Sequence, residues 1–139
     1  MMKKIVLDLD DSFDFEVIGI CTSLVDYRLA WEINQCLGLK LSRSGEDYYK
    51  TNKKGEVLSS HSLYEDVDED QNTDYILIKN KNKGKHFVSE LEMIDFFLLI
   101  NALRNDVSET STRLREVQTI QTTVVVNVDE HKSFAQLEL

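Results

Sequence analysis

Alternating hydrophobic and polar residues open the chain, a pattern typical of half-buried strands. The stretch "KKIVLDLD" at residues 3–10 alternates after Ile5, and "FDFEVIGI" at residues 13–20 places apolar residues on one face and acidic residues on the other. Turn-forming residues separate the two stretches at Asp10–Ser12. The pattern predicts two strands that could pair as a hairpin across this turn.

The next stretch of the chain has hydrophobic residues at the spacing of a helix. Residues 23–38, "SLVDYRLAWEINQCLG", predict a helix over about 24–37. Ser23 and Asp26 have the spacing of a capping box, and Gly38 stands where a helix commonly ends. The apolar residues at helical spacing are Val25, Leu29, Ile33, Cys36 and Leu37, and all of them except Cys36 are expected to face the sheet.

The middle of the chain is polar and broken by turn residues. Short strand-like runs alternate there with "NKKG" and "NKNKGK", which have the composition of turns. We expect a meander of short strands at 46–51, 56–60 and 62–67, an acidic loop, and a strand at 75–79.

The run "MIDFFLLI" at residues 93–100 is ambiguous, because a short apolar block fits either a helix over 89–104 or a strand buried on both faces. A further helix over about 107–117 can open at Asp106 or Ser108. The β-branched residues at 120–128 then predict another strand. The apolar residues of the C-terminal segment indicate that it packs on the rest of the chain.

Composition places these elements in one domain, 1–139, since a chain of 139 residues with 42% hydrophobic residues can bury one core. The net charge of −9 disfavours nucleic-acid binding, and the basic stretch 79–85 is more typical of a solvated turn. No apolar run is long enough for a membrane span. Cys21 and Cys36 lack metal-binding or redox spacing, which favours buried thiols in a reducing cytoplasm.

Two acidic stretches resemble metal sites. In "IVLDLDDS", Asp8 and Asp10 have the spacing of the first motif of haloacid-dehalogenase-like phosphohydrolases, but no later segment supplies the expected lysine and acidic pair. The polar face of a hairpin explains the same alternation more simply. A small metal-dependent hydrolase that uses Asp8, Asp10 and Asp14 is therefore the alternative function rather than the leading one.

The segment 66–77 has acidic or amide residues at the alternate positions of a calcium loop. Gln71 replaces the glycine and Leu77 the glutamate that such a loop requires, so a solvated acidic loop is favoured. The histidines show no metal-binding spacing, and the glycines form no phosphate loop. The sequence therefore predicts no bound cofactor. The alternating positions are Asp66, Asp68, Asp70, Asn72 and Asp74.

Aromatic residues on an acidic chain suit a protein-binding module. Tyr27 and Trp31 lie four residues apart along the predicted helix, and three further tyrosines lie in the strand-rich middle. Those three, Tyr48, Tyr49 and Tyr64, could be anchors for a partner, although packing on the sheet is the simpler interpretation.

The segment "VSELEMIDF" at residues 88–96 resembles the signature of the IPExxxVDY family. Glu90 and Asp95 match the signature directly, and Ser89 replaces its proline. Further likeness lies in the opening stretch, in residues 26–41 and at Lys132–Ser133. The resemblance implies a small bacterial protein without an assigned activity, substrate or cofactor, so it brings no functional residue to these positions.

A proline-compatible position at 89 favours a loop that leads into a strand, and we therefore predict a strand at 94–100 followed by a β-α-β unit. Glu90 is then expected to bind turn amides, and Asp95 to mark the polar start of the strand. A paired-carboxylate site made of Glu90 and Asp95 is the alternative.

The sequence thus predicts an α+β fold: one mostly antiparallel sheet of about six to eight strands, two packed helices and a C-terminal β-α-β unit. The leading function is a non-catalytic, cytoplasmic protein-binding or regulatory module. Its candidate binding residues are Tyr27, Trp31, Glu90 and Asp95. The expected partner is another protein, and a homodimer is plausible because the fold is rich in strands.

Overall fold

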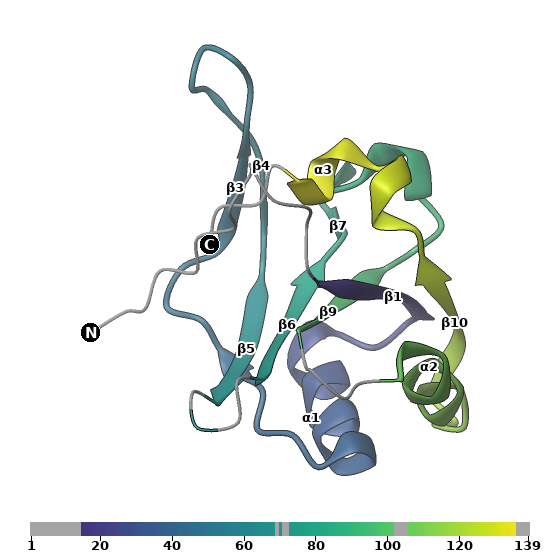
Figure 1. Ribbon diagram of the computed structural model, residues 1–139. Helices are drawn as coiled ribbons and strands as arrows, with labels where there is room; N and C mark the ends of the chain where they lie inside the picture. The colour runs from purple at the N-terminus through teal and green to yellow at the C-terminus, as the bar shows by residue number, and fades with distance from the viewer. Residues whose placement is uncertain (1–14, 69, 71–72, 102–105, 136–139) are drawn as a thin grey trace.

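A computed structural model describes residues 15–68, 70, 73–101 and 106–135 (Figure 1). In it the apolar run forms a central strand, β9 (Phe96–Asn101), which hydrogen-bonds to β1 (Glu16–Thr22) on one side and to β6 (Thr73–Lys79) on the other. The first five residues of β9 are almost completely buried, and they alternate between two cores. The predicted strand is confirmed.

The main sheet has six strands in the order β10-β1-β9-β6-β5-β2, and every neighbouring pair is antiparallel. Its other members are β2 (Ser42–Arg43), β5 (Leu63–Asp68) and β10 (Ile120–Val126). Two separate hairpins are formed by β3 (Tyr48–Thr51) with β4 (Val57–His61), and by β7 (Lys81–Asn82) with β8 (Lys85–His86). The protein is a single α+β domain, as the sequence predicted.

The predicted β-α-β unit is present in a split form. Strands β9 and β10 are both antiparallel to β1, so they run parallel to each other with β1 between them, and α2 (Val107–Arg115) connects them. Because β1 is paired along both edges, it has no free edge for the predicted hairpin with residues 3–10. That segment lies outside the described residues.

Helices α1 (Asp26–Leu37) and α2 cover one face of the sheet (Figure 1). Leu29 and Ile33 are fully buried there, as predicted, whereas Val25 is 53% exposed, so its predicted contact with the sheet is wrong. Val25 is itself the N-cap, and no side chain caps the helix. The Ser23 capping box is therefore also wrong, but Gly38 ends the helix in the left-handed conformation as expected.

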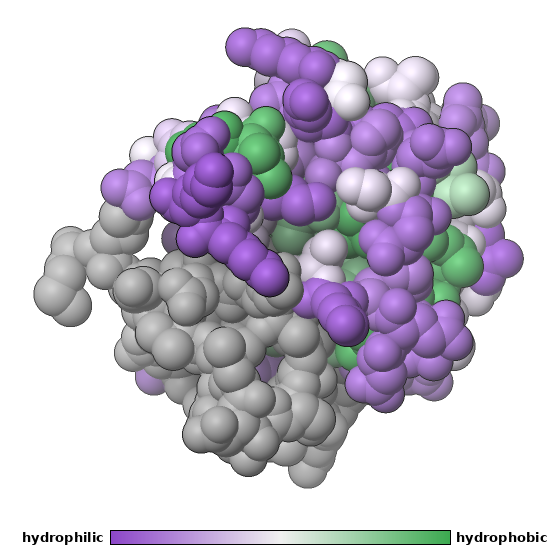
Figure 2. Space-filling view, turned by 90° about the horizontal axis from the view of Figure 1, so that it is seen from above, coloured by the Kyte–Doolittle hydropathy of each residue, from purple (hydrophilic) through white to green (hydrophobic). Residues whose placement is uncertain are grey.

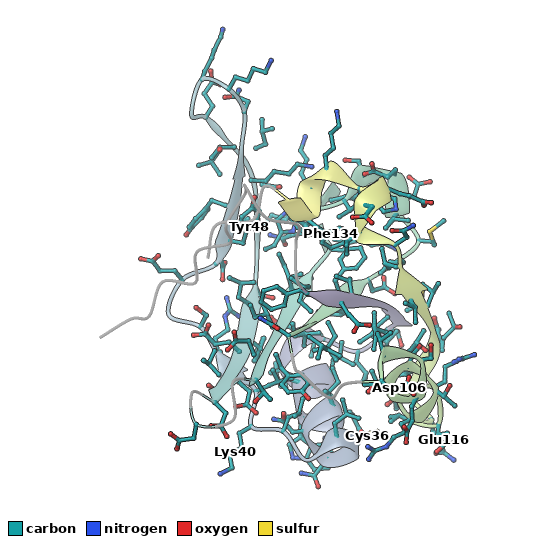
Figure 3. All side chains as sticks on the ribbon, in the orientation of Figure 1. Cys36, Lys40, Tyr48, Asp106, Glu116 and Phe134 are labelled. Atoms are coloured by element: carbon teal, nitrogen blue, oxygen red, sulfur yellow. The ribbon has the colours of Figure 1, made fainter. Side chains whose placement is uncertain are left out.

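The opposite face of the sheet is covered by the 3₁₀ helix η1 (Ser89–Leu91), by its flanking residues and by α3 (Lys132–Ala135). Phe134 of α3 is completely buried and packs edge-on against Phe87 and Phe97, at ring-centroid distances of 5.6 and 5.2 Å (Figure 3). The C-terminal segment is therefore packed at Phe134, as predicted.

Strand β10 departs from the predicted alternation. Its register against β1 shifts opposite Cys21 and Thr22, where Gln121 is an extra residue, and a second 3₁₀ helix, η2 (Val128–Glu130), follows the strand. The buried positions are consequently Ile120, Thr123 and Val126 rather than every second residue. A bulge of this kind exchanges the two faces of a strand along its length.

The meander in the middle of the chain is confirmed. Asn52 and Gly55 form the turn between β3 and β4, where the Asn52 side chain accepts hydrogen bonds from the backbone amides of Lys54 and Glu56. This hairpin projects from the body of the molecule, while β5 joins the main sheet (Figure 1).

Candidate functional site

The segment that carries the family-like signature is held by a buried asparagine that sequence reasoning had assigned to a turn. Asn80 is completely buried directly after β6. Its side-chain amide donates to the carbonyl groups of Leu91 and Ile94, at 3.0 and 2.7 Å. Its side-chain oxygen accepts from the amide of Val88 at 2.8 Å, and its own backbone N–H donates to the carbonyl of Asp95. One side chain thus fixes the path of residues 88–95.

Glu90 lies in η1 with about half of its side chain exposed. A hydrogen bond from its own backbone amide lowers the pKa of Glu90 below its usual value, and the neighbouring His131 and Lys50 act in the same direction. The His131 Nδ1 atom lies 3.6 Å from the carboxylate, which is too long for a hydrogen bond and leaves an ion pair only for a protonated imidazole. These contacts support the local structural role expected for Glu90.

Asp95 connects three parts of the fold. Its Oδ2 atom accepts a hydrogen bond of 2.8 Å from the backbone amide of Thr22, and its Oδ1 atom lies 3.2 Å from the Nζ atom of Lys81. The carboxylate therefore joins the start of β9 to the end of β1 and to the β7–β8 hairpin. Burial, and secondarily the charge of Asp95, raises the pKa of the adjacent Cys21 thiol. A raised pKa disfavours the reactive thiolate.

The two signature carboxylates have different partners, so the contacts offer no support for a paired-carboxylate site. Within the described ranges, no three histidine, cysteine, aspartate or glutamate side chains are grouped so that they could hold a metal ion. Asp8, Asp10 and Asp14 lie outside those ranges, and the hydrolase that would use them stays a prediction.

Three acids of the calcium-like segment lie on two antiparallel strands, Asp70 lies in the turn between them, and Asn72 is outside the described residues. Asp66 and Asp68 belong to β5 and Asp74 to β6, and Asp74 pairs across the sheet with Val67. Asp66 accepts a hydrogen bond from the backbone amide of Lys40. This is the geometry of a β-hairpin flanked by strands, whereas a calcium loop of this type is flanked by helices.

Two exposed aromatic side chains lie on α1. Tyr27 is 69% and Trp31 49% exposed, and they are one helical turn apart. The guanidinium carbon of Arg28 lies 4.7 Å from the centre of the Trp31 ring, and Arg28 also pairs with Glu32 at 3.3 Å. We call Val25, Tyr27, Arg28 and Trp31 the α1 surface.

The three tyrosines in the middle of the chain behave differently from one another. Tyr64 is buried, Tyr48 packs edge-on against Phe87, and only Tyr49 is exposed. For Tyr64 and Tyr48 the structure supports the packing interpretation. The end of the molecule that carries α3 and the tip of the β3–β4 hairpin is mostly hydrophilic over its described part (Figure 2).

A groove of about 440 Å³ lies between α1 and the end of α2, where Cys36 and Glu116 are neighbours (Figure 3). Arg113 donates a 2.7 Å hydrogen bond to the carbonyl of Cys36, so this cation is already engaged by the protein. Burial raises the pKa of the Cys36 thiol, which makes it a weak nucleophile. The thiol at this groove is therefore not activated for nucleophilic catalysis.

No protein-family model matches the chain, and no curated protein sequence matches it. Membership of the IPExxxVDY family accordingly stays a prediction from residues 88–96 and the accompanying segments. In the described part of the chain, every helix is too short or too polar to pass through a membrane.

Proposed function

We propose that the protein is a non-catalytic module that binds another protein through the α1 surface. The observation that carries this proposal is the grouping of Tyr27, Arg28 and Trp31 on exposed positions of one helix. Tryptophan, tyrosine and arginine are the residue types most enriched among those that dominate binding energy. An exposed aromatic pair has no role in the core, whereas Leu29 and Ile33 supply the buried face of the same helix.

The charge of the chain indicates the chemistry of the partner. With a net charge of −9, the protein attracts basic surfaces and repels acidic ones. We infer a partner with an apolar pocket for the two rings and basic side chains around it. The free thiols of Cys21 and Cys36 fit a reducing compartment, so the proposed location is the cytoplasm.

The test is capture of partners from an extract of the source cells by the tagged protein and by three alanine variants. Trp31→Ala and Tyr27→Ala should lose the captured protein, because truncating a dominant interface residue costs about 2 kcal/mol or more, roughly a thirtyfold loss of affinity. Tyr49→Ala is the matched control, since Tyr49 is a similarly exposed aromatic residue on a different element. Equal capture by all variants, or no capture by the wild type, would contradict the proposal.

The metal-dependent hydrolase stays the alternative, and it makes a separate prediction. A divalent ion that binds only the folded state, and is present at a concentration of a hundred times its Kd, adds about 2.7 kcal/mol to the free energy of unfolding. Thermal unfolding with Mg²⁺, Mn²⁺ or Ca²⁺ should then show a raised Tm, and Asp8→Asn with Asp10→Asn should abolish the increase. Unchanged melting with every ion would remove this alternative.

A further inference from the structure

The two edges of the main sheet differ in how they are protected. At one edge, β2 has only two residues, and its Arg43 makes ion pairs with Asp26 and Asp47. The next strand, β5, carries acidic residues. A short, charged edge of this kind discourages pairing with another strand.

The other edge, β10, is neither short nor charged, and its bulge at Gln121 leaves residues 122–126 regular. It has seven residues, "IQTTVVV", without a charge, a proline or a glycine, and six of the seven are β-branched. It stands at the end of the strand order, with β1 as its neighbour in the sheet. Val124 and Val125 are 47% and 44% exposed, and adjacent residues of a strand point to opposite faces. Strands with these properties pair readily with an added strand.

The charge around β10 identifies what kind of chain can approach it. From Val107 to Val126, two acids are balanced by two bases: Glu109 and Glu116 against Arg113 and Arg115. This stretch is neutral on a chain whose total charge is −9. Two copies of the protein repel each other over most of their surface, and the repulsion is smallest where both present this neutral stretch.

We propose that β10 pairs antiparallel with β10 of a second copy, so that the two six-stranded sheets form one continuous sheet. A two-fold axis through Val124 overlaps residues 122–126, the regular part of the strand after the bulge at Gln121, and sets Thr123 opposite Val125 and Val124 opposite its own copy. The exposed valines then gain cross-strand contacts on both faces of the joined sheet.

Helix α2 fits the same two-fold arrangement. Helix α2 packs on β10 and β1, the two strands next to the proposed junction. Neighbouring strands lie about 4.8 Å apart and packed helices about 8–10 Å apart, so a helix over two strands at the junction would lie next to its own copy. The first turn of α2 carries the acid Glu109 and its last turn carries the base Arg115, whereas Arg113 is engaged on the α1 side by the Cys36 carbonyl. In an antiparallel pair of identical helices, each acid end faces a basic end. This charge complementarity favours a second copy over an unrelated peptide.

The test is the self-association of the full chain, measured by sedimentation equilibrium over a range of concentrations. Val124→Lys should weaken the dimer by about tenfold or more, because the two lysines would lie opposite each other on one face of the joined sheet. Val57→Lys is the matched control: it makes the same change of charge at an exposed valine of β4, far from β10 in the chain, and it should leave association unchanged. Circular dichroism and Tm check that both variants fold.

Hydrogen exchange gives a second, independent readout. In the dimer the outward amides of residues 122–126 should exchange slowly, and dilution or Val124→Lys should make them exchange fast. A wild type that is monomeric at every concentration would overturn the proposal. A dimer that Val124→Lys does not weaken, or that Val57→Lys weakens to the same extent, would also overturn it. Slow amide exchange of β10 in a monomer would overturn it as well, because it would show that another segment of the same chain covers the edge. None of these results depends on whether the α1 surface binds a partner.

Discussion

His61 provides a quantitative prediction about the effect of acid on stability. It is the last residue of β4 and is completely buried. Its Nδ1 atom lies 2.8 Å from the backbone oxygen of Lys79, and its Nε2 atom lies 2.7 Å from the hydroxyl of Ser59. A carbonyl only accepts, so Nδ1 carries the proton and Nε2 accepts from Ser59. A second proton on Nε2 would remove this acceptor.

The surroundings of His61 disfavour its charged form. Burial, the largest cause, lowers the pKa of His61 from 6.5 to about 4, and the positive charge of Lys50 adds to the effect. The hydrogen bond to the Lys79 carbonyl acts in the opposite direction without reversing the shift. The ring also packs near the rings of Tyr48 and Phe87, at centroid distances of 6.5 and 6.0 Å.

The sign of the effect follows from linkage. The folded state keeps His61 neutral until about pH 4, whereas the unfolded chain takes up a proton near pH 6.5. Between these values the unfolded state binds more protons, so the free energy of unfolding falls as the pH is lowered. With these two pKa values, the loss that His61 causes between pH 7 and pH 5 is about 2 kcal/mol.

The assay is urea unfolding at pH 7 and pH 5 for the wild type, His61→Gln and His86→Gln. His61→Gln removes the titration, so its stability should change by about 2 kcal/mol less between the two pH values than that of the wild type. His86→Gln, at a half-buried histidine on β8 whose charge is the smallest of the causes that act on the pKa of His61, should change the pH dependence far less than His61→Gln does. Because the comparison uses the pH dependence of each variant, a lower absolute stability of His61→Gln does not affect it. Equal pH dependence in all three proteins would refute the reasoning.

Two further predictions concern the signature segment and the sheet beneath it. Asn80→Ala leaves buried carbonyl and amide groups without partners, so urea unfolding should show that the free energy of unfolding falls by about 3 kcal/mol. The control Asn82→Ala removes one partly buried donor and should lower it by about 1 kcal/mol. Equal losses in the two variants would show that Asn80 does not organise the segment. A Cβ at Gly19 would lie 2.6 Å from the Cδ1 atom of Ile94, so thermal unfolding of Gly19→Ala should show a loss of about 1–3 kcal/mol. Adding Ile94→Val removes that atom and should restore part of the loss, whereas additive losses would contradict this account.

The sequence by itself determined the elements whose local period is strong. The spacing of Leu29 and Ile33 placed the buried face of α1, and Gly38 marked its end. The apolar run at 93–100 did not by itself separate a helix from a strand buried on both faces; the proline-compatible position at 89 favoured the strand that the structure shows. These properties depend on residues close together in the chain, so the sequence expresses them directly.

The tertiary structure alone decided which elements are neighbours. Strand β1 lies between β9 and β10 and pairs with one of them along each edge. It therefore has no free edge for the hairpin that the sequence suggested. The bulge opposite Cys21 changed which residues of β10 are buried, and Val25 became exposed although it continues the apolar stripe. In the sequence Asn80 has the features of a turn residue, and only the fold places the carbonyl groups of Leu91 and Ile94 within hydrogen-bond distance of its side chain. Burial of a polar group depends on partners distant in sequence, and a local period carries no information about them.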